Sequence, residues 1–472
     1  MIGFNKLRLI IFICLAVSGL TTTAQDNNYW TQQYGNVSTL LGGAVTGSYN
    51  DNGSMYYNPA TLAFTDTIKI SFSAGLYQAN VMRVSNPTSN DTAIGVWNFK
   101  NFPISFYPVI RLNSKARLGF IYLTRIISNF SLHDYKDAPM DVTGNGTQQP
   151  FIATFDYSNQ VTENWYGLSY SRVINPKSSF GICLYGTYRF QTVYYNYSAN
   201  AIMDEAKQDY LITNISNYLD YDLYQGIIKT GYFHEFDNFS FGCALTLPSF
   251  YVLSYSRMSS QFYFSGWQSY LPGDSINDLL IVQEQSNEKA NYKYPATLSI
   301  GFKWKLPNLI LYATSDLYAA IKQYSILKYS DSNNPTLQPP FDAVNSVLLN
   351  AQTASRFFGN IAMGAQFKIR NNKSIIAGFS TDFNALPKGF NPKGFRTSTA
   401  RNNLYHASAG MDVHIKKVKI NGGLKVSYGY SRNQQQFVNM STASTANLLI
   451  GDRKYDSNYN YLAFNLLLGL NF

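Results

Sequence analysis

The residues that decide the fold are the last twelve, Tyr461-Leu462-Ala463-Phe464-Asn465-Leu466-Leu467-Leu468-Gly469-Leu470-Asn471-Phe472. On one phase every residue is large and apolar: Leu462, Phe464, Leu466, Leu468, Leu470 and Phe472. This period of two indicates a β-strand with one apolar face. In water such a terminal strand would expose an apolar edge that is prone to aggregation. In lipid a closed barrel satisfies the hydrogen bonds of every backbone group. We therefore predict an all-β protein, a transmembrane antiparallel β-barrel.

The same alternation recurs along most of the chain. We predict strands at 67–83, 95–110, 115–132, 150–174, around 180–190, 221–235, 239–256, 291–305, 308–322, 356–370, 373–383, 404–416, 418–431 and up to 472. We predict long loops between several of them, including 133–149, 200–220, 257–290 and 323–355. The total is about 14 strands, in which short turns alternate with long loops, as is typical of outer-membrane barrels.

The start of the chain has the features of an export signal. Lys6 and Arg8 precede an apolar run over 9–20, and the small residues Thr22 and Ala24 stand where a signal peptidase requires them. We predict a signal peptide over 1–24. No later segment approaches the roughly 20 consecutive apolar residues of a membrane helix, which excludes a helical inner-membrane protein. We expect the protein in the outer membrane of a Gram-negative bacterium.

The exported part of the chain is basic. The formal net charge of the whole sequence is +10, and loss of Lys6 and Arg8 with the signal lowers it to +8. Charge alone is a weak indication of nucleic-acid binding. Phosphate groups at a membrane surface explain the excess more simply. We therefore predict contact with outer-membrane lipid and lipopolysaccharide, and no nucleic-acid partner.

Residues 34–62 are unlike both a strand and an exposed linker. Glycine, asparagine and an Asn-Pro step are dense there, which indicates compact irregular backbone. Apolar residues such as Leu40, Leu41 and Met55 are interleaved, so the segment should pack against other parts of the chain. We predict that 25–66 forms an N-terminal hatch, or plug, in the lumen of a barrel formed by 67–472.

Two motifs of this segment resemble the hatch of FadL-type outer-membrane transporters. They are Gly42-Gly43-Ala44 and, some fifteen residues on, Asn58-Pro59-Ala60. The family usually continues with Gly-Leu, whereas here Thr61 replaces the glycine and Leu62 is kept. A second part of the chain, Tyr294 to Phe302 followed by Asp316-Leu317-Tyr318, is similar to the family's Pro-led strand with a central glycine and its next strand with an inward aspartate.

The resemblance implies passive uptake of hydrophobic small molecules such as long-chain fatty acids. External loops would capture the ligand, a lumenal pocket would receive it, and a rearrangement of the hatch would release it, with a sideways exit through a strand kink. No cofactor and no metal are expected. The barrel-assembly machinery would read the terminal strand through Phe464, Leu466, Leu468, Leu470 and Phe472.

Several charged residues fall on the inward phase of the predicted strands: Lys69, Arg189, Lys303, Asp316 and Lys368. The simplest interpretation is a wet lumen with internal ion pairs. A sharper one is that a cation such as Arg189 holds the carboxylate of a fatty acid, while apolar walls enclose the tail. Candidate ligand contacts are Leu40, Leu41, Met55, Arg189 and Asp316.

The histidines and cysteines do not form a motif. None of His133, His234, His406 and His414 has the spacing of a zinc-ligand set, and His414 shares a strand phase with Asp412, which predicts a hydrogen bond. Cys183 falls on the polar phase of its strand and Cys243 on the apolar phase of another, so we expect no disulfide between them.

Two other functions stay open. A FadL-like barrel can serve as an accessory component of protein secretion or surface display. An outer-membrane hydrolase would use a histidine with serine or aspartate, assembled from separate strands. Nothing in the spacing of the sequence requires such a triad, and we predict no catalytic residues.

Overall fold

The computed structural model describes residues 27–65, 70–90, 92–100, 105–206, 209–267, 278–328, 350–370, 372–390, 396–415 and 418–471. The predicted signal peptide, Lys69 and Phe472 lie outside these residues. The N-terminal segment, residues 27–65, contains three short helices, α2 (Asn36–Leu40), α3 (Ser54–Tyr57) and η1 (Pro59–Phe64). Two 3-10 turns, η4 (Met440–Thr442) and η5 (Thr445–Asn447), lie in the last long connection. Among the described residues no helix is long and apolar enough to cross a membrane.

Strands make up most of the rest of the chain. They are β1 (Ile70–Ser85), β2 (Ala93–Lys100), β3 (Ser105–Arg111), β4 (Ala116–Asp137), β5 (Phe151–Asn175), β6 (Ser178–Asp204), β7 (Asp209–Glu235), β8 (Phe239–Thr246), β9 (Phe250–Ser265), β10 (Leu279–Ser286), β11 (Thr297–Lys305), β12 (Leu309–Tyr318), β13 (Ile321–Leu327), β14 (Ala351–Ser355), β15 (Phe358–Arg370), β16 (Lys373–Asp382), β17 (Asn403–Ile415), β18 (Val418–Gln434) and β19 (Ser457–Asn471).

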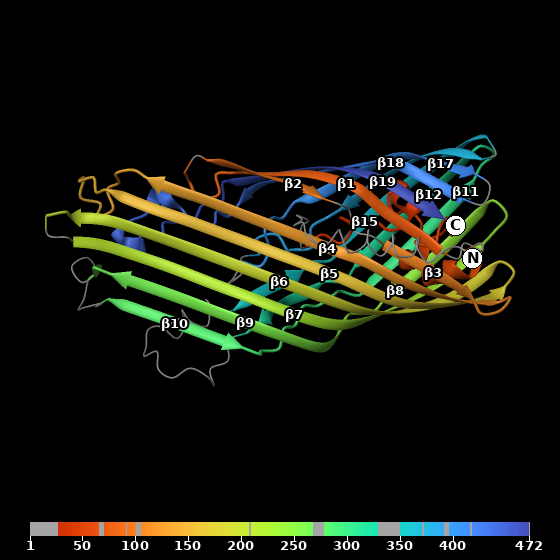
Figure 1. The fold of residues 1–472 in the computed structure, drawn as a ribbon, viewed down its shortest axis with the longest axis horizontal. Helices are drawn as coiled ribbons and strands as arrows, with labels where there is room; N and C mark the ends of the chain where they lie inside the picture. The colour runs from red at the N-terminus through yellow and green to blue at the C-terminus, as the bar shows by residue number, and fades with distance from the viewer. Residues whose placement is uncertain are drawn as a thin grey trace, which may run out of the picture.

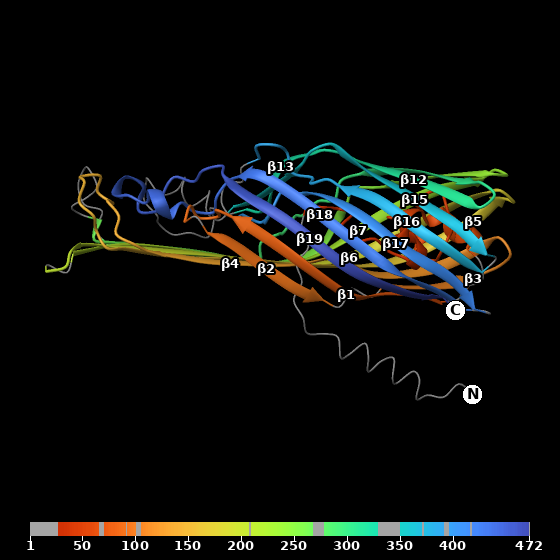
Figure 2. The same cartoon turned by 90° about the horizontal axis from the view of Figure 1, so that it is seen from above.

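The strands pair antiparallel in a series that returns to its beginning. From β1 the pairings lead through β3, β4, β5, β6, β7, β8, β11, β12, β15, β16, β17 and β18 to β19. β19 pairs with β1 again, from Ser71 opposite Asn471 to Ser85 opposite Asn458. β2, β9 and β10 extend this series beside β1 and β7. Figures 1 and 2 show β4–β7 as the longest strands, which reach far beyond β11, β12 and β15 at one end of the molecule.

The predicted faces of the last strand are confirmed. Phe464 is 52% exposed, whereas its neighbour Asn465 is 2% exposed. Leu462, Leu466 and Leu468 are also exposed, and Leu470 is half-exposed. β6 alternates in the same way, with Leu184 exposed and Tyr185 fully buried. The outer surface therefore carries the apolar phase, and the opposite phase faces the interior.

Among the described residues, the short turns that follow β3, β5, β7 and β11 lie where the sequence predicts them, but several predicted loops are wrong. β4 continues to Asp137, so His133 lies on a strand and not in a loop. β6 and β7 run on to Asp204 and from Asp209, across most of the predicted loop over 200–220. β9, β10, β13 and β14 likewise occupy parts of predicted loops. In the extensions of β6 and β7 apolar residues such as Val193 and Leu211 lie on the buried face and polar residues lie outward, which reverses the pattern that the prediction depends on.

In one strand, β4, the buried positions change from odd-numbered to even-numbered residues along its length. In β4, Ile121 and Leu123 are buried, and beyond a register shift between Thr124 and Ile126 the buried residues are Phe130 and Leu132. The shift is a β-bulge at Arg125, which places two residues opposite one on β5. Arg125 is itself buried. The bulge therefore aims a cation into the interior while the apolar residues on both sides of it keep their places.

The two described cysteines provide a test of these faces. Cys183 is fully buried on β6, whereas Cys243 is half-buried on the exposed phase of β8, and both thiols are free. We expect N-ethylmaleimide to modify Cys243 at least tenfold faster than Cys183 in folded protein, because a thiol must be reached to react. Peptide mass spectrometry measures the two rates. Equal rates before unfolding would contradict the assignment, and unfolded protein, in which both thiols react, is the control.

Candidate functional site

The N-terminal segment is held inside the strands by polar contacts with their backbone. The amide nitrogen of Asn58 donates to the carbonyls of Thr46 and of Tyr232 on β7, at 2.9 and 3.0 Å, and its oxygen accepts from the backbone N–H of Ala60. The carbonyl of Ala60 accepts from the hydroxyls of Ser171 and Ser179, at 3.0 and 2.7 Å. Asn58-Pro59-Ala60, predicted to belong to a hatch, thus connects the segment to β5, β6 and β7.

Asp51 organises the other half of the segment. Its fully buried carboxylate accepts from the backbone N–H groups of Val37 and Ser38 at 2.6 and 2.9 Å, at the start of α2. It also accepts from the Ser38 hydroxyl at 2.8 Å. An aspartate in this place satisfies N–H groups that a helix start leaves without partners. Gly35 beside it has φ +88°, and a Cβ there would lie 2.6 Å from the carboxylate.

The wall meets the N-terminal segment mainly through glycines. Eight of them form four cross-strand pairs: Gly181 with Gly231, Gly242 with Gly301, Gly364 with Gly378, and Gly410 with Gly423. A Cβ on any of the eight would collide with the segment; on Gly378 it would lie 2.4 Å from the backbone nitrogen of Gly42. Glycine in a strand marks close approach of another backbone. The paired glycines therefore form a shallow seat for residues 40–59.

The first residues of the segment are held by one buried carboxylate. Asp382, at the end of β16, accepts from the backbone N–H groups of Tyr29 and Trp30, both at 2.9 Å, and from the Thr31 hydroxyl at 2.8 Å. Lys425 on β18 donates to the carbonyl of Thr31 at 2.9 Å. These contacts fix Tyr29 and Trp30 across the interior, where both side chains line a pocket.

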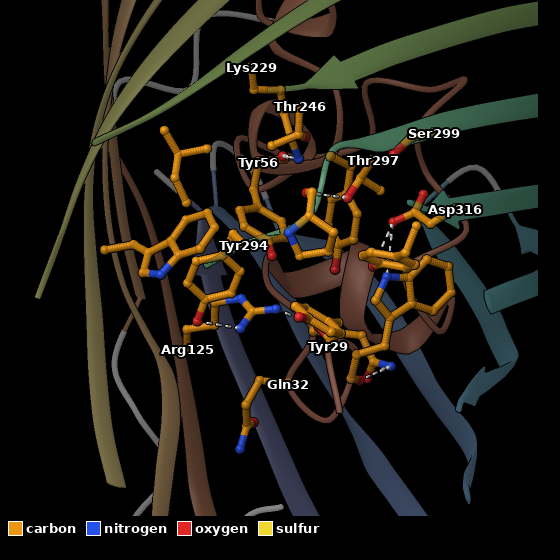
Figure 3. A pocket seen from close by; sticks show the side chains of 17 residues that line it. Tyr29, Gln32, Tyr56, Arg125, Lys229, Thr246, Tyr294, Thr297, Ser299 and Asp316 are labelled. Carbon is orange, nitrogen blue, oxygen red and sulfur yellow. Dashed lines mark hydrogen bonds between the residues drawn. The ribbon is translucent and has the colours of Figure 1, made fainter. Parts of the chain in front are cut away.

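This lumenal pocket is lined by aromatic rings from the N-terminal segment and the wall (Figure 3). The aromatic residues are Tyr29, Trp30, Tyr56, Tyr57, Trp165, Tyr294 and Tyr318. Tyr29 stacks on Tyr318 at 5.0 Å, and Trp165 meets Tyr294 edge to face at 5.6 Å. Aromatic walls with few polar groups are typical of sites for hydrophobic ligands.

Arg125 occupies the centre of these rings. Its guanidinium carbon lies 5.0 Å from the ring centroid of Tyr29, 5.2 Å from that of Trp165 and 4.9 Å from that of Tyr294. Distances of this size allow cation–π attraction. The β4 bulge thus places a cation within the aromatic lining, on the side of the pocket where Figure 3 shows Arg125 beside Tyr294.

A single buried carboxylate serves two arginines behind the rings. Glu163 on β5 lies 3.7 Å from a guanidinium nitrogen of Arg125 and 3.0 Å from one of Arg189. The Tyr294 hydroxyl also donates to it. Glu163 is fully buried and supplies one negative charge against the two positive charges of Arg125 and Arg189. These three side chains together therefore have a net positive charge.

The opposite side of the pocket carries a second pair of charges. The Lys229 ammonium donates to the carbonyl of Tyr56 at 2.8 Å and lies 4.8 Å from the Tyr56 ring. Asp316 on β12 accepts from the Trp30 indole at 3.0 Å. The pocket therefore has charged groups on two sides, Arg125 on one and Lys229 and Asp316 on the other, with aromatic rings between them.

The free space in the lumenal pocket is small. Its volume is about 50 Å³. A single water requires about 10–15 Å³ by this measure, so the space holds a few waters at most. The side chains of the N-terminal segment fill the remainder. A hydrophobic ligand of any size would need Tyr29, Trp30 or Tyr56 to move.

One of the five residues predicted to contact ligand lies at the pocket, and the other four lie elsewhere. Asp316 lines the lumenal pocket. Leu40, Leu41 and Met55 are buried, but they pack on wall glycines: Leu40 on Gly410 and Gly423, Leu41 on Gly364, and Met55 on Gly119. Arg189 is fully buried against Glu163 and the Tyr221 hydroxyl, with its guanidinium 3.9 Å from the Tyr292 ring. It lies behind the pocket lining and not in it.

Four residues of this region were not predicted from the sequence: Arg125, Glu163, Trp165 and Lys229. Glu163 and Trp165 lie on the inward phase of the predicted strand 150–174, and an inward carboxylate there was a readable signal. Lys229 lies in the predicted strand 221–235. Arg125 gave no signal of its own, because only the bulge decides which way it points.

The histidines have local partners. The predicted contact of His414 with Asp412 is confirmed at 3.3 Å. His406 lies 2.7 Å from the Ser427 hydroxyl and 3.9 Å from Asp382, but all three are buried and Asp382 already accepts from three donors of the N-terminal segment. Within the described residues no group of three or more His, Cys, Asp or Glu side chains could hold a metal ion.

The fold of the chain is similar to that of several solved structures. The chain resembles transport barrels over almost its whole length. A Pseudomonas aeruginosa FadL homologue aligns with a TM-score of 0.57 and 13% identity, over 96% of this chain and 99% of that one. The Pseudomonas putida toluene transporter TodX aligns with a TM-score of 0.54 and 15% identity, over 95% and 99%. The Ralstonia pickettii toluene transporter TbuX aligns with a TM-score of 0.50 and 13% identity, over 93% and 98%.

The fold is therefore FadL-type, which confirms the resemblance predicted from the sequence. No protein-family model matches the chain, and no curated protein matches it.

Replacing Glu163 should destabilise the protein. Glu163→Gln leaves Arg125 and Arg189 buried without a counter-charge, which is expected to lower the free energy of unfolding by about 3–5 kcal/mol. Urea unfolding in lipid vesicles, followed by tryptophan fluorescence, measures the change. Lys177→Gln, which removes an exposed pair with Asp237, is the control and should leave the midpoint unchanged. Equal midpoints for both variants would contradict the buried charge group.

The glycine seat predicts a second, separate effect. Gly378→Val would push a side chain into the backbone of Gly42, at an overpacking cost of about 1–3 kcal/mol, and should release the N-terminal segment. Chymotrypsin should then cut within residues 27–65, as detected by mass spectrometry. Gly186→Val on β6 is the control, because a Cβ there meets nothing within 4 Å. Equal protection of both variants would show that the segment is not seated on Gly378.

Proposed function

We propose that this protein is an outer-membrane channel for passive uptake of hydrophobic small molecules. The observation that carries the proposal is the aromatic lumenal pocket between the N-terminal segment and the wall. We further propose that the ring of pairings is a closed transmembrane barrel of about 14 strands. In this barrel β2 and β3 together occupy one strand position, and β9, β10, β13 and β14 extend the strands at other positions. Its exposed apolar phase would face lipid. The fold it shares with a FadL homologue and with toluene transporters supports this proposal.

In this proposal the N-terminal segment is a hatch. The lumenal pocket has too little free volume for a substrate, so entry requires the side chains of Tyr29, Trp30 or Tyr56 to withdraw. The glycine seat and the Asn58 contacts hold the rest of the segment, so the movement would be concentrated near residues 27–33. Arg125 and Lys229 are then the cations within reach of a polar substrate group, in place of Arg189.

A sideways exit is best supported at β4. The bulge at Arg125 interrupts this strand beside the lumenal pocket. Within the described residues β3 pairs with β4 only between Phe106 and Arg111, and no ladder joins β2 to β4. Weak pairing of a strand with its neighbour allows the wall to part there without breaking a regular ladder.

A disulfide lock tests which part of the hatch moves. A Cβ on Gly364 would lie 3.1 Å from the Cβ of Leu41, near the separation of about 3.8 Å that a disulfide spans. We expect Leu41→Cys/Gly364→Cys, in a background with Cys183→Ala and Cys243→Ala, to keep its uptake of radiolabelled toluene and oleate when oxidised, because the movement lies before the glycine seat. Dithiothreitol should change nothing.

The controls separate the alternatives. Each single cysteine variant should transport under both conditions. Loss of uptake on oxidation, restored by dithiothreitol, would contradict a movement limited to residues 27–33 and show that the seated part must move as well. Absence of toluene and oleate uptake in the wild type, together with loss of surface display of secreted proteins in cells without the chain, would favour the secretion role. Ester hydrolysis abolished by His406→Ala would favour a hydrolase.

A further inference from the structure

The end of the strand ring that carries the short turns has a surplus of positive charge on its inner side. The strands β3, β7, β11, β15 and β17 end here, on the right in Figure 1. Six cations lie on the inward phase of the described strand ends: Arg111, Arg117, Lys303, Lys305, Lys368 and Lys419. Two carboxylates, Glu235 and Asp412, share this phase. We call the six cations the basic mouth.

Both carboxylates are already neutralised. Lys305 donates to Glu235 at 2.5 Å, and the ammonium of Lys419 lies 3.2 Å from Asp412. Three of the other cations form no ion pair with a described carboxylate: Arg111, Lys303 and Lys368. These three charges form a surplus that a partner would meet at this end of the protein.

Lys303 is the most deeply placed of the three. It is 6% exposed, and its ammonium lies 4.9 Å from the ring of Tyr49 in the N-terminal segment. Tyr49 is itself fixed to the wall, because its hydroxyl donates to Glu235 at 2.8 Å. A buried ammonium without a carboxylate partner is costly, and negative charge placed close to it offsets part of that cost. The mouth therefore favours an anionic group in front of it.

The cations of the basic mouth face away from the lipid-facing surface. On β11 and its turn, Lys303 and Lys305 alternate with Trp304 and Leu306, which are both exposed on the outside. Lys368 lies between two exposed apolar residues of β15 in the same way. The outer surface of these strand ends is apolar and suits the bilayer, so contact with lipid does not account for the inward cations.

The cations also lie too far apart for one small anion. From β4 to β11 the pairings take five steps, which is about 24 Å of wall at about 4.8 Å a strand. Arg117 and Lys303 therefore lie on different sides of the mouth. Between them the N-terminal segment presents Tyr49 and Phe64, whose ring centroids are 5.9 Å apart. An occupant that meets the whole mouth has to be an extended surface with several negative charges.

We propose that the basic mouth docks a soluble acidic protein, which contacts the N-terminal segment at Tyr49 and Phe64. In the proposed barrel the short turns face the periplasm, so this partner is a periplasmic protein. Complementary charge speeds the encounter and selects acidic surfaces over basic ones. The inference rests on the proposed outer-membrane barrel and adds a docking partner to it.

Binding of acidic peptides to the purified protein in an uncharged detergent tests the mouth. By fluorescence anisotropy, a labelled peptide of 20 glutamates should bind at least tenfold more tightly than one of six, because only the longer peptide reaches across the mouth. Binding should weaken in 0.5 M NaCl. Equal affinity of the two peptides would overturn the proposal, and this comparison needs no variant. Inorganic phosphate that competes as well as the long peptide would also overturn it.

Two double variants with the same change in charge locate the binding. Arg111→Gln/Lys368→Gln, which alters two exposed residues of the mouth, should weaken binding of the long peptide at least tenfold. Lys289→Gln/Lys454→Gln removes two exposed lysines from the long connections and should leave binding within twofold. Equal effects of the two variants would show a general charge effect and overturn the docking face.

Photo-crosslinking in cells identifies the occupant. p-Benzoylphenylalanine in place of Asn308, in the turn between β11 and β12, should cross-link a soluble exported protein in which acidic residues outnumber basic ones. Arg111→Gln/Lys368→Gln should abolish this product, and the same label in place of Thr147, between β4 and β5, should not form it. Absence of the product, products only with lipid, peptidoglycan or a basic protein, or a product that the double variant leaves unchanged would overturn the proposal.

Toluene uptake by cells separates this inference from the proposed function. Wild-type cells that take up no toluene would contradict the proposed function, while the peptide and cross-linking measurements would still decide the docking face.

Discussion

The contact between backbone and backbone, without side chains between them, is the constraint on which the interior depends. Four pairs of glycines in neighbouring strands leave room for the N-terminal segment to lie directly on the wall. A methyl group would meet the backbone of the segment at Gly181, Gly242, Gly301, Gly364 and Gly378, and its side chains at the other three glycines. Because the seat fixes residues 40–59, the chain before it has to cross the interior, and Tyr29 and Trp30 are brought to the lumenal pocket.

The charges around that pocket follow a related logic. One carboxylate, Glu163, stands between two arginines that the aromatic rings would otherwise leave without a counter-charge. Burial of charge is costly unless partners are close. The surplus positive charge lies against ring faces, which attract cations. The pocket is lined largely by aromatic rings and is nevertheless positively charged. Glu163, which partly neutralises that charge, is held by the two arginines.

Much of the fold could be predicted from local patterns. The period of two locates the strands and the turns at 237–238 and 306–307, because which face a residue takes depends on its immediate neighbours. The prediction fails in the upper parts of β6 and β7, where the pattern is reversed: apolar residues such as Val193 and Leu219 lie inward and polar residues lie outward. Asn58-Pro59-Ala60 predicted the segment that packs inside. The pocket itself could not be predicted, since Arg125, Lys229 and Asp316 come from strands far apart in the chain, and their meeting depends on how the sheet curves.

The bulge in β4 has a consequence for how this strand can change over evolution. Below Arg125 the inward residues carry odd numbers, and above it they carry even ones. Loss of Arg125 would give a regular ladder in which Phe130 and Leu132 still point inward, because Thr124 and Ile126 already lie opposite consecutive residues of β5. The extra residue could therefore be lost without changing the faces of the strand, and what the bulge adds to the interior is one cation.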